Sequence, residues 1–180
     1  MMRAIETGRR VYLRSPRESD RAEFMRLARA NRVLHRPWVY APETSRQFDA
    51  YLARSHAESE RCFLVCQRGD NALAGVINLS QISRGFFQSA YLGYYAFAPA
   101  AGRGLMAEGL ELVLRHAFGK LKLHRLEANI QPGNDRSRLL VERAGFEYEG
   151  YSPRYLKIGG RWRDHERWAI TREAWRGPRA

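Results

Sequence analysis

The sequence predicts an α/β domain over residues 1–180, organised around one central sheet. Hydrophobic residues make up 44% of the chain and aromatic residues 12%, a composition typical of a globular fold. Stretches with the two-residue period of strands alternate with stretches whose apolar residues recur every three or four positions, as in amphipathic helices. No linker-like segment or internal repeat divides the chain, so we expect a single domain.

Seven stretches carry the strand signal. Turn residues separate several of them: Gly69-Asp70-Asn71 follows 62–66, and Ser83-Arg84-Gly85 follows 75–82. The last two flank Gly159-Gly160, which is typical of a hairpin turn. The predicted strands are residues 11–14, 62–66, 75–82, 88–97, 125–130, 146–158 and 161–170.

Four stretches carry the helix signal. The first begins at Asp20, with Glu23 three residues later, and the second at Thr44, with Gln47 three residues later; both pairs predict a capped helix start. The third runs from Gly102 to about Gly119. The expected inward faces of the first two are Phe24, Leu27 and Ala28, and then Phe48, Tyr51 and Leu52.

The fourth helix follows the strand at 125–130. Asn134 is a residue type that caps helices, and Gly145 is one that ends them. Between them, Leu139, Leu140 and Ala144 are expected to form the apolar side.

The charge is strongly basic. Lys and Arg number 31 against 19 Asp and Glu, which gives a net charge of +12 and a pI near 10.4. Such a charge suits a polyanionic partner: nucleic acid, a ribosomal surface or a phosphorylated cofactor. The basic residues are scattered, which favours a generally basic surface over a specific RNA site.

Several protein classes are disfavoured. No apolar run approaches the ~20 residues that span a bilayer, and the first residues lack the apolar core of a signal peptide, so we expect a cytoplasmic protein. Cys62 and Cys66 lie roughly 13 Å apart if they share one strand, too far for a disulfide. Histidines 116 and 124 have no carboxylate partner at metal-ligand spacing, so we expect no metal site.

The most informative stretch is Gly102-Arg103-Gly104, between an aromatic strand and a helix. Glycines one residue apart at such a turn let the backbone approach a ligand. The amides of the first helical turn then point at that ligand, and the helix dipole favours an anion. An ordinary tight turn is the alternative.

Together with the helix from Asn134 to Gly145, this turn resembles the GNAT (Gcn5-related N-acetyltransferase) superfamily. The tail, residues 149–165, makes the chain similar to ribosomal-protein-alanine N-acetyltransferases of the RimJ/RimL type, and closer to RimJ. The resemblance implies a GNAT fold: a mixed, mostly antiparallel sheet of about seven strands flanked by about four helices. It also implies acetyl-CoA as cosubstrate.

The resemblance assigns the cofactor residues. The glycine turn would hold the pyrophosphate of acetyl-CoA, and the helix from Asn134 would lie beside the pantetheine arm. The expected cofactor contacts are therefore Phe97, Gly102, Arg103, Gly104, Leu105, Met106, Asn134 and Ser137. The family usually has Gln or Arg where Pro99 stands, so backbone amides must carry more of the phosphate binding here.

Two residues are candidates for the chemistry. Many relatives protonate the departing thiolate with a tyrosine where this chain has Val141, whereas Ser137 resembles the serine of RimJ/RimL enzymes and could donate to the sulfur. The alternative is a hydroxyl bound to its own helix backbone. Glu108 lies one helical turn beyond Gly104, where it either orients the amine through water or completes a structural network.

The remaining candidates concern the acceptor. Trp38, Phe86 and Tyr94 are aromatic residues expected to contact the substrate, with core packing as the alternative. His35, His124 and His165 are expected to be structural; His165 is the best base among them because Asp164 could fix its tautomer.

These observations favour an N-acetyltransferase that moves the acetyl group of acetyl-CoA to a primary amine. The resemblance points to the N-terminal amine of a protein, such as a small-subunit ribosomal protein. A small-molecule acceptor (a polyamine, amino acid or aminoglycoside) is the enzymatic alternative. A non-catalytic basic module that contacts RNA or the ribosome is the other.

Overall fold

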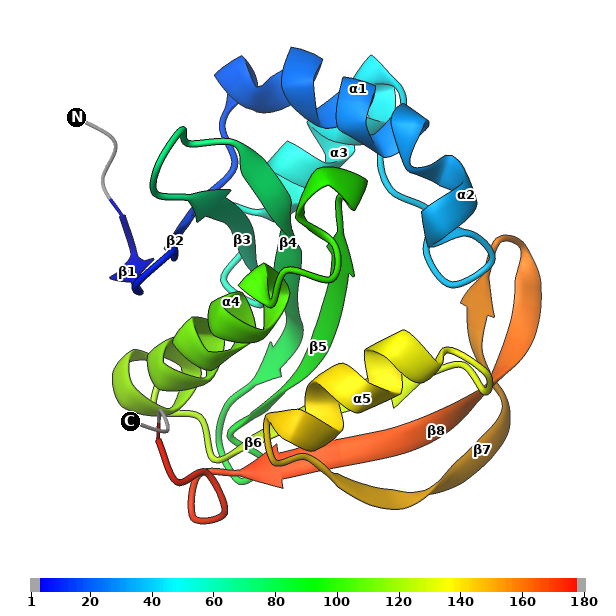
Figure 1. Cartoon of the computed structure of the whole chain (residues 1–180). Coiled ribbons are helices and arrows are strands. Elements are labelled where there is room, and N and C mark those ends of the chain that lie inside the picture. Colours follow the sequence, from blue (N-terminus) through cyan, green and yellow to red (C-terminus); the bar gives the residue numbers. More distant parts are fainter. Residues whose placement is uncertain (1–3, 178–180) are drawn as a thin grey trace.

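The computed structural model describes residues 4–177 and contains one eight-stranded sheet with the order β1-β2-β3-β4-β5-β6-β8-β7 (Figure 1). The seven expected strands are present, and a two-residue strand, β1, is added at the edge. The strands are β1 (Glu6–Thr7), β2 (Val11–Arg14), β3 (Arg61–Gln67), β4 (Leu73–Ser83), β5 (Ser89–Ala96), β6 (Arg125–Ile130), β7 (Glu147–Ile158) and β8 (Arg161–Thr171).

Five α-helices accompany the sheet in the described part of the chain. The four expected helices are present, and the fifth, α2, is a single turn between α1 and the proline-containing segment. The helices are α1 (Arg21–Ala30), α2 (Arg32–His35), α3 (Ser45–Arg54), α4 (Leu105–Arg115) and α5 (Asp135–Arg143).

The sheet is mostly antiparallel, with one parallel pair at its centre. Strands β5 and β6 pair in parallel from Ser89 opposite Arg125 to Leu92 opposite Ala128. Both strands continue beyond these residues without pairing to each other, β5 to Ala96 and β6 to Ile130. The ladder therefore opens toward the ends of the two strands at which α4 and α5 follow.

Helices cover both faces of the sheet, and each face has its own core. Helices α4 and α5 pack on one face, with Phe63, Val65 and Leu110 among the buried residues. Helices α1 and α3 pack on the other, where Leu64 and Phe97 are fully buried. Because β3 is buried on both faces, its sequence reads as a continuous apolar run.

Both cysteines lie on β3 and are buried, free thiols. This agrees with the prediction that Cys62 and Cys66 form no disulfide with each other.

Two predicted details of the first two helices have different outcomes. The box at Thr44 is confirmed: the threonine oxygen accepts from the Gln47 amide, and the Gln47 side chain accepts from the Thr44 amide. The box at Asp20 is wrong. Its carboxylate instead accepts two hydrogen bonds of 2.7 Å from the buried Arg14 guanidinium and one from the Arg17 amide. A hydrogen bond from a guanidinium to a carboxylate is charge-assisted and is stronger than one from a neutral helix amide.

The two helices that follow the parallel strands also differ in detail from expectation. Helix α4 begins at Leu105, three residues later than predicted, and passes at Arg115 into a π-helical turn, His116–Lys120. In α5, Asn134 and Gly145 mark the ends as predicted, with Gly145 at φ +94°. Leu139, however, is 43% exposed, and Val141 is the fully buried residue.

Candidate active site

The candidate site lies where β5 and β6 diverge. The C-terminal ends of these neighbouring parallel strands lead into α4 and α5, so two helix N-termini open on the same region of the molecule (Figure 1). The crevice outside the carboxyl ends of adjacent parallel strands is a common ligand position in α/β proteins. Two converging helix N-termini make this one suited to an anionic ligand.

The glycine turn is built from left-handed backbone. Gly102 has φ +74° and Gly104 has φ +73°, conformations in which other residues are strained. Gly104 is the N-cap residue of α4, and no described side chain caps this helix end. The first-turn amides of α4 therefore have no intrahelical acceptor and are available to a ligand.

Leu105 and Met106 anchor the glycine turn to the core of the sheet. Both side chains are buried, and the Met106 thioether packs directly over Gly75 of β4, where no Cβ would fit. Their side chains are thus committed to the core, while their amides lie in the open first turn. Leu105 and Met106 are therefore expected to contact a ligand through their backbone amides, not through their side chains.

Phe97 does not reach the site. Its ring is fully buried between Phe24 and Tyr95, on the face covered by α1 and α3. Its amide donates to the Ala74 carbonyl, and its carbonyl accepts from the Ala100 amide. The prediction that Phe97 contacts the cofactor is corrected: an aromatic residue at the end of an aromatic strand is here a core residue.

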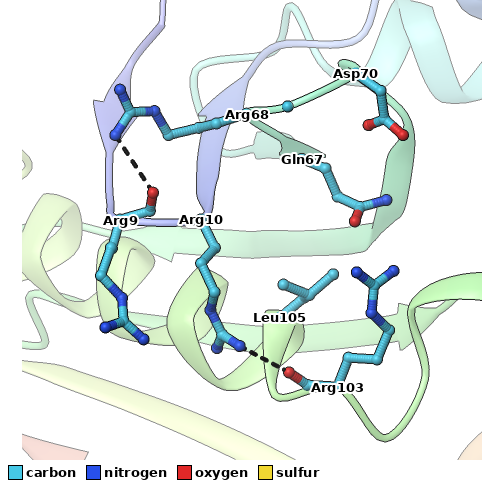
Figure 2. Close-up of a pocket in the computed structure, with 8 residues that line it drawn as sticks. Arg9, Arg10, Gln67, Arg68, Asp70, Arg103 and Leu105 are labelled. Carbon is cyan, nitrogen blue, oxygen red and sulfur yellow. Dashed lines mark hydrogen bonds between the residues drawn. The ribbon is translucent and has the colours of Figure 1, made fainter.

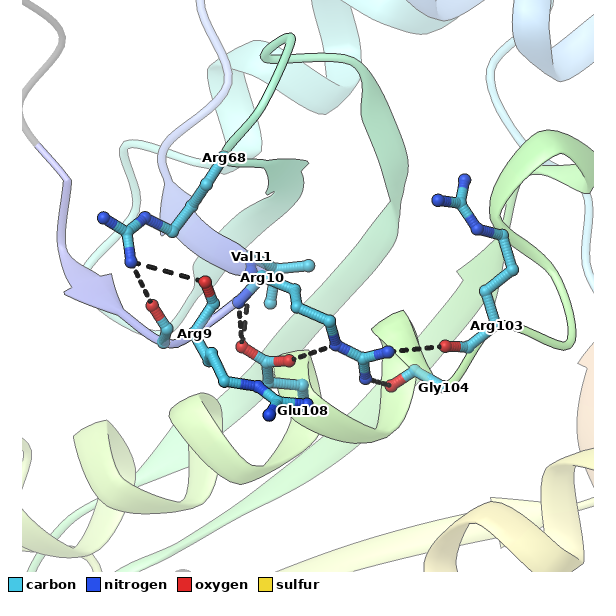
Figure 3. Close-up of polar contacts among 8 residues, drawn as sticks. Arg9, Arg10, Val11, Arg68, Arg103, Gly104 and Glu108 are labelled. Atoms are coloured by element: carbon cyan, nitrogen blue, oxygen red, sulfur yellow. Dashed lines mark hydrogen bonds and ion pairs between the residues drawn. The ribbon is translucent and has the colours of Figure 1, made fainter.

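Glu108 braces the glycine turn to the β1–β2 turn (Figure 3). One carboxylate oxygen accepts from the amides of Arg10, at 2.7 Å, and Val11, at 3.3 Å. The other accepts from Arg10 Nε at 2.9 Å. The same guanidinium donates to the carbonyls of Arg103 and Gly104 at 3.0 and 3.2 Å.

These contacts favour the structural alternative for Glu108. Burial would raise its pKa, but the hydrogen bonds from the Arg10 and Val11 amides and from the Arg10 side chain outweigh burial and lower it. A carboxylate with every oxygen engaged and a lowered pKa is a weak base. Sequence reasoning missed Arg10 because it lies 98 positions from Glu108.

Ser137 and Tyr94 join α5 to β5 at the divergence. The Ser137 hydroxyl donates to the Tyr94 oxygen at 2.6 Å, and the Tyr94 hydroxyl donates to the Ser137 carbonyl at 2.9 Å. Burial raises the pKa of Tyr94, so both groups are neutral donors at physiological pH. The structure thus pairs one predicted catalytic residue with one predicted substrate residue, and the serine does not bind its own helix backbone.

Asn134 holds the start of α5. Its side-chain oxygen accepts from the Ser137 amide at 3.4 Å, and both residues are half-buried. Asn134 thereby sets the position of Ser137 relative to β5, which places the two predicted cofactor residues of this helix together.

Trp38 lies beside the start of α5. The Trp38 carbonyl accepts from the Gln131 side chain at 3.1 Å, and its ring lies close to Gly133 in the β6–α5 connection. Two residues further on, Tyr40 packs on Gly159 in the β7–β8 turn. The α2–α3 connection therefore runs past the diverging strands, with Trp38 beside the β6–α5 connection. Gln131 was not anticipated, because its partner is a distant carbonyl.

Phe86 lies at the wrong end of the sheet. It belongs to the β4–β5 turn, and β5 then runs eight residues, roughly 25 Å, before the glycine turn is reached. The side chain is fully exposed, and so is most of Phe87. The prediction that Phe86 contacts the substrate is therefore corrected; strand direction separates it from the site.

The histidines have structural partners. His35 bonds the Ala96 carbonyl at 2.8 Å, and burial lowers its pKa. His124 pairs with Glu173 at the surface. His165 bonds the Arg163 carbonyl through Nδ1 rather than Asp164, whose carboxylate accepts from Tyr151 and the Arg154 amide.

This arrangement of a glycine turn, two helix N-termini and a divergent parallel pair is that of a coenzyme A-dependent acyltransferase, and sequence comparison agrees. The family model described as "Acetyltransferase (GNAT) domain" matches residues 10–147. The chain belongs to this family, and it is an acetyl-CoA-dependent N-acetyltransferase.

Individual relatives extend the match. The chain is 34% identical over 171 residues to a probable N-acetyltransferase, YjcK, of Bacillus subtilis, covering 91% of this chain and 94% of that one. It is 42% identical over 106 residues to the [ribosomal protein uS5]-alanine N-acetyltransferase of Escherichia coli, covering 59% of this chain and 55% of that protein.

Solved structures share the fold. RimJ of Mycobacterium smegmatis in complex with CoA-disulfide superposes with a TM-score of 0.82 and 29% identity, covering 91% of this chain and 82% of that one. A spermidine N-acetyltransferase of Vibrio cholerae in complex with CoA and spermine has a TM-score of 0.77 at 21% identity, covering 92% of this chain and 97% of that one. The latter likeness concerns the fold alone.

Proposed function

We propose that this enzyme acetylates the N-terminal α-amine of a protein, and that a small-subunit ribosomal protein beginning with a small residue is its substrate. The chain acts as one domain. The acceptor amine lies at the divergence of β5 and β6, beside Trp38. The single observation that carries the choice of amine is the state of the carboxylates around that divergence.

Each carboxylate on the neighbouring elements already has a partner. Glu108 binds Arg10, and Glu127 of β6 binds Arg125. Glu166 of β8, opposite Ile130, accepts from the Trp168 indole. Among the described residues, the polar side chains at or beside the divergence are the hydroxyls of Tyr94 and Ser137 and the amides of Asn129, Gln131 and Asn134, and neither kind of group is a strong base.

A site without a strong base suits an amine that loses its proton easily. An α-amine has a pKa near 7.7–8.0, against about 10.4 for a lysine side chain. At neutral pH roughly a tenth of the former is neutral, against well under a hundredth of the latter. A usable fraction of the α-amine is therefore already neutral and nucleophilic without help from a base. Almost all of a lysine or polyamine amine stays protonated.

The reaction follows from the site. Backbone amides of Gly102 to Met106, with Arg103, hold the pyrophosphate of acetyl-CoA. Asn134 and Ser137 lie along the pantetheine arm. The neutral amine attacks the thioester carbonyl carbon, a C–N bond forms, and the C–S bond breaks. The departing thiolate takes a proton from the paired hydroxyls of Ser137 and Tyr94, and the proton that the amine nitrogen loses on becoming an amide returns to that pair through water, so that both hydroxyls end neutral.

The choice of a ribosomal substrate has two supports. One is the 42% identity to an enzyme that acetylates ribosomal protein uS5. The other is the net charge of +12, which favours an RNA-rich assembly as docking partner.

Peptide acetylation tests the proposal. Ala- and Ser-initiated peptides are compared with spermidine, free lysine and an aminoglycoside at pH 7, and mass spectrometry locates the acetyl group. We expect higher kcat/KM for the peptides and label on the α-amine. A matched peptide with a blocked α-amine and a free lysine is the control.

The small-amine alternative gives the opposite result. Label chiefly on lysine ε-amines, or a higher kcat/KM for spermidine, would contradict the proposal and favour the small-amine alternative. The observation that favours this alternative is only the shared fold of a polyamine enzyme.

A further inference from the structure

An arginine-lined cavity of about 390 Å³ adjoins the glycine turn (Figure 2). The guanidinium groups of Arg9, Arg68 and Arg103 point in different directions there, so they do not converge on one anion. Basic residues and exposed aromatic rings meet instead at the other end of the sheet. Among residues 4–177, the two most exposed aromatic side chains lie there, at the β4–β5 turn.

Phe86 and Phe87 form an aromatic tip at the β4–β5 turn. Phe86 is fully exposed and Phe87 is 73% exposed, so neither ring belongs to the core on either face of the sheet. Soluble domains commonly expose large apolar side chains singly, whereas neighbouring exposed rings mark a contact surface. The tip precedes β5 and the glycine turn follows it, so the whole length of the strand separates them (Figure 1).

The aromatic tip is held by hydrogen bonds to the segment that precedes β6. The Gln88 carbonyl accepts from the amides of His124, at 2.6 Å, and Arg125, at 3.2 Å. The Arg84 guanidinium donates to the Leu121 carbonyl at 2.6 Å. A ring on a turn fixed in this way loses less conformational freedom on binding than a ring on a mobile loop.

The aromatic tip has basic neighbours. Arg84 in the turn, Lys122 before β6 and Arg172 after β8 are all exposed. The Arg172 amide donates to the His124 carbonyl at 2.8 Å, which brings the third segment to the same end of the sheet. Glu173 pairs with His124 and Arg172, but Arg84 and Lys122 have no carboxylate partner among residues 4–177. Flat rings beside unpaired cations suit single-stranded nucleic acid, because bases stack on the rings and phosphates are attracted to the cations.

We propose that the aromatic tip and its basic neighbours bind single-stranded RNA, so that the enzyme docks on an RNA-rich assembly through this end of the sheet. The unpaired cations favour RNA over an apolar protein surface, because burying a charge against apolar atoms costs free energy. The acceptor region lies at the other end of β5, roughly 25 Å away, so docking leaves the acetyl-transfer site open. The inference rests on the ribosomal substrate of the proposed function, but RNA binding is measured without an acceptor amine, so the two can fail separately.

Fluorescence anisotropy with a labelled single-stranded RNA of about eight nucleotides tests the proposal. Phe86→Ala and Phe87→Ala should each weaken binding by about five- to tenfold, the lower part of the range for base–aromatic stacking. Phe86→Trp keeps a flat ring and should keep the wild-type affinity. Phe86→Leu keeps apolar surface without a ring and should bind as weakly as Phe86→Ala.

The basic neighbours should have a different signature. Lys122→Ala should reduce the slope of log K against log salt by about 0.7, the value for one phosphate contact on a single strand. The phenylalanine variants should leave that slope unchanged, because stacking releases no counterion from the RNA.

Trp162→Ala is the matched control. Trp162 is 61% exposed and lies opposite Lys157 in the β7–β8 hairpin, so it is also an exposed ring beside a cation. RNA affinity should not change in this variant. The kcat/KM for a short Ala-initiated peptide should stay at the wild-type value in the Phe86 and Phe87 variants, and melting temperatures check the fold of each.

Several outcomes would overturn the proposal. One is an unchanged RNA affinity when both phenylalanines are replaced by alanine, and another is wild-type affinity in Phe86→Leu. Weaker RNA binding in Trp162→Ala alone would place the RNA on the β7–β8 hairpin. A changed oligomeric state in Phe86→Ala with unchanged RNA binding would assign the aromatic tip to self-association. RNA binding that depends on the tip, together with poor turnover of the peptides, would support the RNA surface and contradict the proposed function.

Discussion

At the scale of single residues, the site depends on backbone conformations that only glycine adopts freely. Gly102 and Gly104 both have φ above +70°, and a Cβ on Gly104 would lie 3.2 Å from Arg10 Nη2. A side chain there would push against the guanidinium that binds the turn carbonyls. The open amides of α4 depend on this turn keeping its shape.

Gly104→Val is therefore expected to weaken acetyl-CoA binding while the fold survives. Left-handed backbone costs a non-glycine residue roughly 1–2 kcal/mol, and the displaced Arg10 adds to that cost. The matched control is Gly85→Val, which has φ +65° in an open turn at the far end of β5. Calorimetry should show lost coenzyme affinity only for Gly104→Val; equal affinities would remove the pyrophosphate site from this turn.

The Ser137–Tyr94 pair makes a second residue-scale prediction. If the paired hydroxyls protonate the thiolate, Ser137→Ala should lower kcat by about 10²-fold, the low end for general acid catalysis, because a thiolate is already a fair leaving group. The KM for acetyl-CoA should change less. Tyr94→Phe should lower kcat too, and the double variant should lose less than the product of the two, as expected for groups acting as a unit.

A full kcat in Ser137→Ala would reduce the pair to a structural link between α5 and β5. In that case thermal unfolding, rather than kinetics, should report the loss of its two hydrogen bonds.

At the scale of elements, the first turn of α4 is held by a contact with the β1–β2 turn, at the β1 edge of the sheet. Glu108 in the first turn accepts from Arg10 and Val11, which hold the β1–β2 turn against the helix. The acidic side chain also complements the helix dipole. The brace therefore positions the glycine turn relative to the β1–β2 turn.

Glu108→Gln is expected to cost stability rather than chemistry. Losing charge-assisted bonds to a partly exposed Arg10 should lower the free energy of unfolding by about 1–2 kcal/mol after solvent screening. The acidic limb of the pH–rate profile should keep its position. A shifted limb would restore Glu108 as the base.

The pH dependence has a definite sign. The folded pKa of Glu108 is lowered, so its stabilisation is present above the ordinary carboxyl pKa of about 4.3 and is lost as pH falls through the folded value. The difference in unfolding free energy between wild type and Glu108→Gln should be constant above about pH 5 and shrink below pH 4. Denaturant titrations at several pH values measure it.

At the scale of the whole molecule, the net charge of +12 concerns association rather than fold. Attraction between this surface and an RNA-rich assembly is screened by salt, with a Debye length of about 10 Å at 0.1 M. Within residues 4–177, no helix is long and apolar enough to span a membrane.

Turnover on a ribosome-assembled substrate should therefore depend on salt, and turnover on a short neutral peptide should not. We expect kcat/KM for the assembled substrate to fall steeply between about 50 and 200 mM salt, with kcat little changed. The peptide with the same N-terminus is the matched control. A parallel salt response for both substrates would contradict a docking role for the basic surface.

The sequence alone determined the fold class, the seven main strands and the presence of the two helices that follow the parallel strands, with the start of α5. These features depend on local periodicity, on Gly at left-handed positions and on capping residues such as Thr44 and Asn134. Each is encoded within a few residues, so pattern reading recovers it. The prediction of acetyl transfer came from the resemblance of the glycine turn and the Asn134 helix to a known family.

Only the tertiary structure decided which candidate residues meet. The Arg10–Glu108 brace and the Ser137–Tyr94 pair each join residues at least 40 positions apart. Phe86 and Phe97 were misplaced because strand direction and the choice of sheet face are set by packing of the whole chain. These pairings cannot be predicted from local sequence, because each one joins residues on different helices, strands or turns.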